Sequence, residues 1–340
     1  MKKVNIVFAH PLYGNSHEIY KAFQRRKDVN IIPLINEDNK VSSNLISKIR
    51  YKLKIPVDNF NINKKLKDFN FNNIDILFII KGNEIKPYIL KEIKQKFPSL
   101  KIINWSQDDM YAWHNRSLYY TLGIKYYDLI VTQKSYNIKE LLSLGAKKVL
   151  FQNKAFSKGI HFPQVCSKKF SHDVVFVGYP EKERNEYMKY LADDGIIIHI
   201  YGYPNAWKKL KYKIEHKNII IHDKSLEGID YASALSCAKI SLCFLRKINR
   251  DLQTSRSIEI PACGGFMIAE RTDEHKKLFE EDKEAVYFDT KEELLEKVKY
   301  YLEHEEERKQ IAKAGYDRTR NSDYSYDNRV KEILRKINEF

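Results

Sequence analysis

Short apolar runs alternate with amphipathic stretches along the first half of the chain. Runs rich in β-branched residues predict strands at residues 4–9, 29–34, 74–80, 101–105, 129–132 and 148–151. Between them, apolar residues three and four positions apart predict helices at residues 16–26, 44–53, 86–97, 116–122 and 136–144. Neighbouring parallel strands need a long connection, which a helix supplies. The alternation therefore predicts a doubly wound α/β unit.

The same pattern begins again near residue 173. It predicts strands at residues 173–177, 196–201, 219–222, 240–245, 265–269 and 285–288, with helices at 183–192, 229–237, 255–262, 273–279 and 291–303. We expect an α/β fold with two Rossmann-like domains facing a cleft, an N-terminal domain at residues 1–160 and a C-terminal domain at 170–320. A helix at 321–340 follows, and its return to the first domain stays open. The linker is expected near 152–172, where Gly159 and Pro163 interrupt the pattern.

Composition narrows the class of protein. At 340 residues the chain exceeds one ordinary core, and 43% hydrophobic residues exclude global disorder. The longest apolar runs are far short of the ~18 residues of a membrane span, and residues 6–9 are too few for a secretory signal. We therefore expect a cytoplasmic protein. The four cysteines form no C-x-x-C pair and have no nearby histidine at the spacing of a metal site. We therefore expect reduced, mostly buried thiols, no disulfide framework and no metal site.

Charge is distributed unevenly. Residues 1–170 hold 30 lysines and arginines against 13 acidic residues, whereas residues 171–340 hold 30 against 32. A one-sided basic field attracts anionic membrane, nucleic acid or an acidic acceptor, but a solvated lysine-rich surface gives the same count. Residues 44–54 combine apolar and basic positions at helical spacing. Such a stretch is found in helices that lie on an anionic membrane and, more often, in core-facing helices.

The most specific segment is RSIEIPACGGFMIAE at residues 256–270. Leu278 with Phe279, Glu284 with Ala285, a helix at 292–304 and an I-A-x-x-G stretch at 311–315 follow it. Together with DVVFVGYPEKER at 173–184, these motifs resemble nucleotide-sugar glycosyltransferases of GT-B architecture, in the branch of the spore maturation protein CgeB and its relatives. The resemblance covers roughly residues 100–330.

The resemblance implies a donor site in the C-terminal domain. It assigns Arg184, near a helix start, as the clamp on the donor diphosphate, and a guanidinium suits phosphate because it forms a bidentate fork. It assigns Glu259 to the donor ribose, with Arg256 in the same motif. Pairing of Arg184 with Glu181 or Glu183, and of Glu259 with Arg256, is the structural alternative. The donor-binding residues that we expect are Gly178, Arg184, Tyr201, Gly202, Arg256, Glu259, Gly264 and Gly265.

Several of these positions also follow from their local sequence. Tyr201 and Gly202 end a predicted strand, where an aromatic face can pack on a nucleobase or simply close the strand. Gly264 and Gly265 end a helix, and the same turn brings the backbone close to the donor. In the first half, Gly14 and Asn15 form the loop after the first strand, beside the donor phosphates or the acceptor.

Candidate catalytic residues are fewer. Asp108, Asp109 and His114 follow the fourth strand, and adjacent carboxylates favour a raised pKa that suits a base, although a capping pair explains them equally well. We take Asp109 and His114 as the candidates from this loop; His10 and His161 are weaker ones. In related retaining enzymes a glutamate stands eight positions before the ribose-binding one. Here Asp251 replaces it and is the third candidate.

The function that we expect is a metal-independent, retaining transfer of a sugar from a nucleotide-diphosphate donor. The acceptor would be a polysaccharide, a lipid-linked sugar or another cell-surface glycan, reached at the inner face of the membrane. Asp109 or His114 acting as base would instead fit inversion. The alternatives are a phage-type DNA-base glucosyltransferase and a non-catalytic nucleotide-sugar-binding protein. An oxidoreductase is disfavoured because no G-x-G-x-x-G follows either first strand.

Overall fold

The computed structural model describes residues 3–35, 49–50, 52–207, 214–222, 224–337 and 339. The chain divides into two compact units. Unit 1 comprises Met1–Asn153 with Tyr326–Phe340, and unit 2 comprises Lys154–Ser325. The segment that we expected to be a linker, residues 152–172, thus belongs to unit 2 from Lys154 onwards, and of the expected last helix only the part from Tyr326 on belongs to unit 1.

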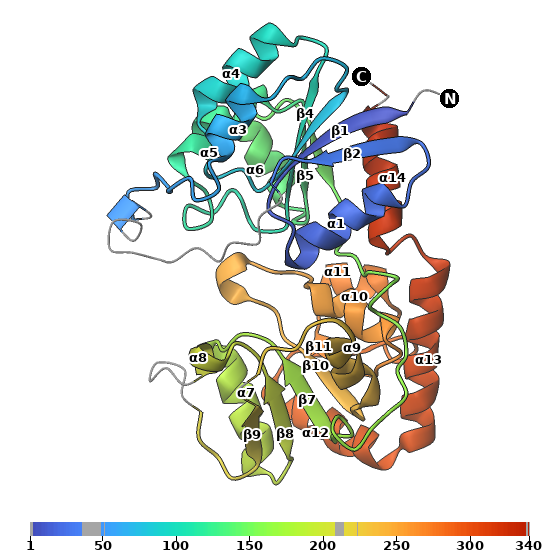
Figure 1. Ribbon diagram of the computed structural model, residues 1–340. Coiled ribbons are helices and arrows are strands. Elements are labelled where there is room, and N and C mark those ends of the chain that lie inside the picture. The colour runs from blue at the N-terminus through green and yellow to red at the C-terminus, as the bar shows by residue number, and fades with distance from the viewer. Residues whose placement is uncertain are drawn as a thin grey trace. The chain divides into compact units, whose positions relative to one another are not determined.

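Unit 1 is built on a parallel sheet with strand order β2-β1-β3-β4-β5-β6 (Figure 1). Its strands are β1 (Val4–Ala9), β2 (Val29–Pro33), β3 (Ile76–Ile80), β4 (Lys101–Ser106), β5 (Leu129–Thr132) and β6 (Val149–Phe151). Its helices are α1 (Gly14–Gln24), α3 (Ile62–Asp68), α4 (Pro87–Lys96), α5 (Leu118–Gly123), α6 (Asn137–Ser143) and α14 (Tyr326–Ile337).

Side chains alternate between the two faces of this sheet. Val7 of β1 belongs to the core formed with α4, α5 and α6. The next residue, Phe8, stacks on Phe78 of β3, and Phe78 meets Phe23 of α1 edge-on. On this second face, Trp105 of β4 meets Tyr326 of α14 with ring centroids 6.4 Å apart. The last helix of the chain thus returns to cover the first sheet, beside α1.

Unit 2 repeats the architecture, with strand order β12-β11-β10-β7-β8-β9. Its strands are β7 (Val174–Val177), β8 (Ile198–Tyr201), β9 (Ile219–His222), β10 (Ile240–Cys243), β11 (Met267–Glu270) and β12 (Val286–Phe288). Its helices are α7 (Lys182–Asp193), α8 (Pro204–Trp207), α9 (Gly228–Cys237), α10 (Ser255–Ala262), α11 (Asp273–Leu278), α12 (Lys291–Glu303) and α13 (Glu305–Asn321). One sheet face packs on α9 and α10, and the other packs on α7 and α12.

The predicted α/β fold is confirmed, and every predicted strand is present with ends shifted by no more than two residues. Runs of buried β-branched residues explain this accuracy, because a strand covered on both faces is apolar along its length. The short helices α3 and α8 were not predicted. Most of the helix expected at 44–53 lies outside the described residues.

The cysteine prediction was wrong in one respect. Cys166 and Cys237 form a disulfide, with Cα atoms 5.2 Å apart, although 71 positions separate them in sequence. It ties the segment before β7 to the end of α9. Cys243 and Cys263 are free and buried, as expected. Sequence spacing gave no sign of the pair because only the tertiary structure brings these residues together.

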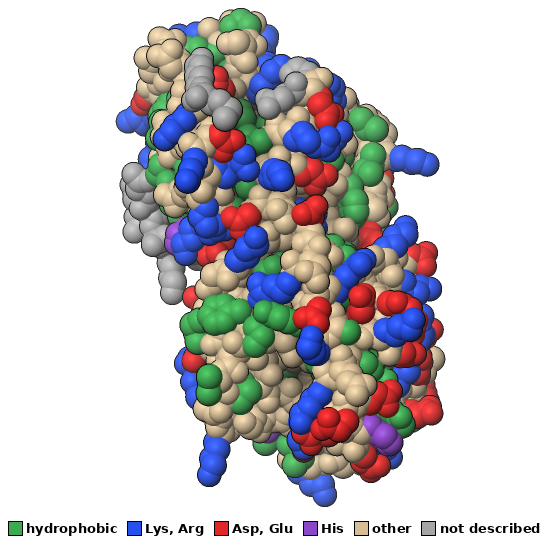
Figure 2. Space-filling view, turned by 90° about the vertical axis from the view of Figure 1, so that its right-hand side faces the viewer, with side chains coloured by type: hydrophobic (Ala, Val, Ile, Leu, Met, Phe, Trp, Pro, Cys, Tyr) green, Lys and Arg blue, Asp and Glu red, His purple; other side chains and the backbone are tan. Residues whose placement is uncertain are grey.

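The surface carries charges of both signs. On the face in Figure 2, basic side chains are interspersed with acidic ones rather than gathered into one continuous patch. The exposed side of α13 contributes ion pairs one helical turn apart, such as Lys309 with Glu305 at 2.7 Å. Within the described part of the chain, no helix is both long enough and apolar enough to span a membrane.

Candidate functional site

Each sheet has one place where its strand order reverses. This place lies between β1 and β3 in unit 1 and between β7 and β10 in unit 2. Ligands of open α/β sheets bind beyond the carboxyl ends of the strands at such a point, because the loops there diverge and leave a crevice. A ligand is therefore expected at the loops after β7 and β10 in unit 2, and at those after β1 and β3 in unit 1.

Arg184 fills the crevice of unit 2. Its guanidinium donates to the carbonyl oxygens of Tyr179 at 2.9 Å, Phe244 at 3.2 Å and Leu245 at 3.2 Å. Only 3% of the residue is exposed, and burial lowers the pKa of Arg184 to about 10. Arg184 thus connects the loops after β7 and β10. This role differs from the one that the resemblance implies, a clamp on the donor diphosphate.

A second polar group lies against α10. Tyr231 of α9 donates its hydroxyl hydrogen to Oε2 of Glu259 at 2.5 Å. Nε2 of His161 lies 3.9 Å from Oε1 of the same carboxylate, and Arg256 stands one turn before it on α10. We call Tyr231, Arg256, Glu259 and His161 the Glu259 cluster. Its members come from α9, α10 and the segment before β7.

The proton positions in this cluster follow from its hydrogen bonds. Nδ1 of His161 accepts from the backbone N–H of Ser157 at 3.0 Å, so the proton of a neutral ring is on Nε2 and points to Glu259. Burial, reinforced by Glu259, raises the pKa of Tyr231 well above its usual value. Burial alone would lower the pKa of Arg256, but Tyr231 and Glu259 hold it above its usual value. The cluster therefore presents an ionised guanidinium beside a protonated phenol.

The glycines of unit 2 mark close backbone approaches. Gly264 adopts a φ of +72° at the end of α10, with Pro163 packed over it. A Cβ on Gly265 would lie 2.3 Å from the carbonyl oxygen of Leu235. A Cβ on Gly202 would lie 2.3 Å from the carbonyl oxygen of Gly178, so the ends of β7 and β8 touch. Packing between elements of unit 2 already requires Gly202 and Gly265.

Tyr201 is covered rather than open. Its ring stacks on His222 with centroids 4.2 Å apart, and its hydroxyl lies 2.9 Å from Nε2 of His172. The residue is 4% exposed. The aromatic face expected to meet a nucleobase is thus occupied by a histidine ring of the neighbouring strand.

Unit 1 has a pocket of about 290 Å³ at its reversal point. His10, Gly14 and Asn15 line it together with Lys81 and Asp108, which form an ion pair at 2.8 Å. Nδ1 of His10 lies 2.8 Å from the carbonyl oxygen of Pro11, so this nitrogen carries the ring proton and Nε2 is left as an acceptor. Burial lowers the pKa of His10 to about 4, so the ring is neutral at physiological pH.

The three predicted catalytic residues lie apart from this pocket's lining. Asp109 is buried, and its Oδ1 accepts from the backbone N–H groups of Tyr111 and Ala112, each at 3.1 Å, and from Asn137 at 2.9 Å. This is the geometry of a capping carboxylate. His114 is exposed, and Asp251 is buried in unit 2. The structure instead brings His10 and Asp108 to the pocket and His161 to Glu259. From the sequence, His10 and His161 were weaker candidates than Asp109 and His114.

A larger hollow, of about 720 Å³, lies between the starts of α7 and α12. Its volume suits a nucleotide sugar. Its lining, however, holds more carboxylates than ammonium groups: Glu181, Glu183, Glu186, Asp289 and Glu292 against Lys182, Lys247 and Lys291. A diphosphate would meet net repulsion there, so the Glu259 cluster remains the stronger candidate.

Comparison with known proteins agrees with this architecture. The family model described as Glycosyl transferase-like matches residues 184–335, a little less than half of the chain. The matched segment contains α10 with Arg256 and Glu259. No curated protein matches the sequence.

Solved structures match over nearly the whole chain. Sucrose-phosphate synthase from Thermosynechococcus elongatus has a TM-score of 0.68 at 8% identity, covering 98% of this chain and 99% of that one. Anabaena Alr3699/HepE, in complex with UDP and glucose, has a TM-score of 0.66 at 11% identity, and the match covers 99% of this chain and 100% of that one. A glycosyltransferase from Rickettsia africae ESF-5 has a TM-score of 0.63 at 13% sequence identity, and the match covers 100% of this chain and 99% of that one.

The class of fold follows directly. Two six-stranded parallel sheets, each between helices, match GT-B structures, so the chain has the GT-B fold. The family match and these neighbours together support a glycosyltransferase.

Proposed function

We propose that this protein is a glycosyltransferase that takes its sugar from a nucleotide-diphosphate donor held by unit 2. The observation that carries the proposal is the coincidence of the family match with the Glu259 cluster on α10. A carboxylate accepts the two hydroxyls of a ribose, as acidic residues do in dinucleotide sites. Only 5% of Glu259 is exposed, but each of its carboxylate oxygens has two lone pairs, so the bond from Tyr231 does not use up the capacity of this carboxylate to accept hydrogen bonds.

A donor site must bind the ribose and must also neutralise the charge of the two phosphates. Arg256 is half-buried beside Glu259, donates to the hydroxyl oxygen of Thr254 at 3.0 Å and also hydrogen-bonds to Tyr231. A guanidinium has five N–H donors, so these two bonds do not use all of them. We assign the diphosphate to Arg256, with Arg184 holding the loops in place behind it. Positive side chains then stabilise the negative charge of the leaving phosphate, which other transferases achieve with a metal ion. The transfer that we propose therefore needs no cofactor.

The transfer that we propose retains the stereochemistry at the sugar. The bond from the anomeric carbon to the phosphate oxygen breaks, the acceptor oxygen bonds to the same face, and the leaving phosphate takes the acceptor's proton. The capping role of Asp109 and the low pKa of His10 support this choice, because an inverting enzyme needs a stronger base beside the acceptor. NMR of the anomeric proton in the product distinguishes the two outcomes.

Unit 1 offers a surface for a lipid-linked or other polyanionic glycan acceptor. Trp113 is 56% exposed, with Nζ of Lys54 and Cζ of Arg116 5.7 and 5.6 Å from its ring centroid. Leu53, Tyr111 and Leu118 are also exposed. We call these six residues the Trp113 surface. Amphipathic aromatic rings among cations are typical of contact with an anionic membrane, and we propose that the protein works at the inner face of the membrane.

A donor-binding experiment tests the proposal. Calorimetry with UDP-, GDP-, ADP- and CMP-sugars identifies the donor for the wild-type protein. Glu259→Gln keeps the side-chain volume but removes the charge, and we expect at least ~10-fold weaker donor binding, since hydrogen bonds to charged groups contribute about 1.5–3 kcal/mol. Glu296→Gln, an exposed carboxylate of α12, is the matched control. Addition of a chelator should leave turnover unchanged.

The other outcomes separate the alternatives. Failure of the wild-type protein to bind any of these donors, or wild-type affinity in Glu259→Gln, contradicts the proposed site. Donor binding without turnover on any acceptor indicates a binding protein. Tight and strongly salt-dependent association with duplex DNA indicates a DNA glucosyltransferase.

A further inference from the structure

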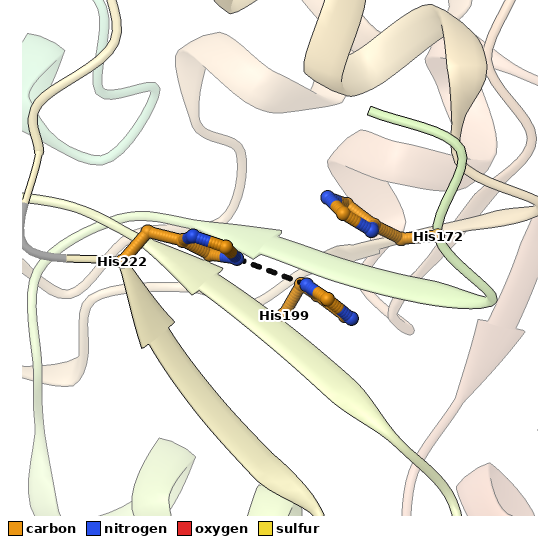
Figure 3. A group of neighbouring side chains, drawn as sticks. All are labelled: His172, His199 and His222. Atoms are coloured by element: carbon orange, nitrogen blue, oxygen red, sulfur yellow. Dashed lines mark hydrogen bonds between the residues drawn. The ribbon is translucent and has the colours of Figure 1, made fainter. Parts of the chain in front are cut away.

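Three histidines gather at one edge of the sheet of unit 2. His172 precedes β7, His199 lies in β8 and His222 ends β9 (Figure 3). Each offers one ring nitrogen such that the three nitrogens all lie within 4.8 Å of one another. Neither the donor site nor the transfer reaction proposed above uses them.

The strand register explains why these side chains meet. β8 pairs with β7 on one side and with β9 on the other, with Val175 opposite His199 and Tyr201 opposite His222. Side chains two positions apart share a face, so His199, Tyr201 and His222 point to the same side of the sheet. His199 and His222 are half-buried, and His172 is 9% exposed. The group is thus held by three neighbouring segments and is open to solvent on one side.

The rings are in the form that binds a metal. Neutral imidazoles do not repel a cation, and each has one nitrogen lone pair. The rings of His172 and His199 stack with centroids 3.6 Å apart, an arrangement that two imidazolium ions would oppose.

Binding of an ion by all three rings would break the hydrogen bond between His199 and His222. Nδ1 of His199 lies 2.9 Å from Nε2 of His222, so the two nitrogens share one proton. Moving the proton to the other nitrogen of its ring leaves both as lone pairs without changing the charge. A tetrahedral ion with bonds of about 2.0–2.1 Å separates its nitrogen ligands by about 3.3 Å. This pair therefore needs to open only slightly, and any pair that lies farther apart, within the 4.8 Å that encloses the three nitrogens, needs to close.

We propose that His172, His199 and His222 bind one Zn²⁺ ion per chain. Three nitrogen donors without a carboxylate favour Zn²⁺, Ni²⁺ or Cu²⁺ over Mg²⁺ or Ca²⁺, which prefer oxygen ligands. Tyr201 supplies an outer partner, because its hydroxyl lies 2.9 Å from Nε2 of His172 and fixes that ring. The ion joins three adjacent segments of the sheet, and its binding therefore stabilises unit 2.

Zinc titration of tag-free, chelator-stripped protein tests the site. Thiol reductants are left out, because they would release Cys166 and Cys237 as competing ligands. Calorimetry should show one Zn²⁺ bound per chain with a Kd in the micromolar range or below, accompanied by a higher unfolding temperature, and no response to Mg²⁺. His199→Ala and His222→Ala should each weaken binding at least ~10-fold. His304→Ala, an exposed histidine after α12, should bind as the wild type does.

A second measurement needs no variant. Electron paramagnetic resonance of the wild-type protein with one equivalent of Cu²⁺ should show splitting from several imidazole nitrogens, and Zn²⁺ should displace the signal. Absence of Zn²⁺ binding at about 100 µM, a copper spectrum without imidazole nitrogens, or undiminished binding in folded His199→Ala would each overturn the proposal.

Discussion

Gly265 lies where the chain leaves α10 and passes the carbonyl oxygen of Leu235. A Cβ at this position would lie 2.3 Å from that oxygen, and the obstacle is backbone that cannot rotate away. We expect Gly265→Ala to destabilise unit 2 by about 1–3 kcal/mol, the range for a side chain forced into a packed interior. The midpoint of chemical denaturation measures the effect. Gly159→Ala is the control, because nothing lies within 4 Å of a Cβ on Gly159, and it should be neutral or slightly stabilising.

At the scale of elements, α12 begins at an ion-pair network. Arg271, the residue directly after β11, donates to Glu293 of α12 at 2.8 Å and to Glu281 at 2.6 Å. The bond from Arg271 is the largest cause that lowers the pKa of Glu293 to about 2, from a usual 4.5. A lowered carboxyl pKa stabilises the fold above the unfolded value, and this stabilisation is lost as pH falls from about 4.5 to 2.

Glu293→Gln tests this network. We expect the variant to be less stable than the wild type at pH 7, and the difference to shrink as pH falls through the range from about 4.5 to 2, since the wild-type carboxylate is then protonated. Urea denaturation at several pH values measures it. Glu292→Gln, the exposed neighbour on α12, should show little of this pH dependence. A constant difference between wild type and Glu293→Gln down to pH 2 would contradict the network's role.

The disulfide also acts at the scale of elements, because it links α9 covalently to the segment that contains His161. In the chain-entropy account, a closed loop with a sequence separation of 71 contributes up to about 4 kcal/mol. We therefore expect Cys237→Ser to lower the stability of unit 2 by ~2–4 kcal/mol under oxidising conditions. In excess reductant, wild type and variant should unfold alike, and a difference that persists there points to packing of the cysteine rather than to the bond.

At the scale of the whole molecule, the first half of the sequence is strongly basic and the second is nearly neutral. We expect the protein to sediment with anionic vesicles at about 0.1 M salt and to be released at about 1 M, because the screening length falls from about 10 to 3 Å. Trp113→Ala should weaken sedimentation. Ile229→Ala, an equally exposed apolar residue of unit 2, should not. Equal binding to neutral and anionic vesicles would contradict the proposal that the basic charge of the protein attracts it to an anionic membrane.

The sequence by itself determined the twelve strands, their alternation with helices and the resemblance that pointed to Arg256 and Glu259. Buried strands are apolar runs bounded by turn residues, and this local signal needs no knowledge of partners. The family match over residues 184–335 falls on the segment where the resemblance is densest.

The tertiary structure alone decided which side chains meet. In the folded chain His161 lies beside Glu259, and Cys166 is bonded to Cys237. Arg184 donates to three backbone carbonyl oxygens. The side chains of His172, His199 and His222 lie close together. These contacts depend on strand register and on how helices cross the sheet, which are set by packing over the whole unit. Hydrophobic periodicity shows which face of an element is buried, but it does not show which distant residue will lie opposite.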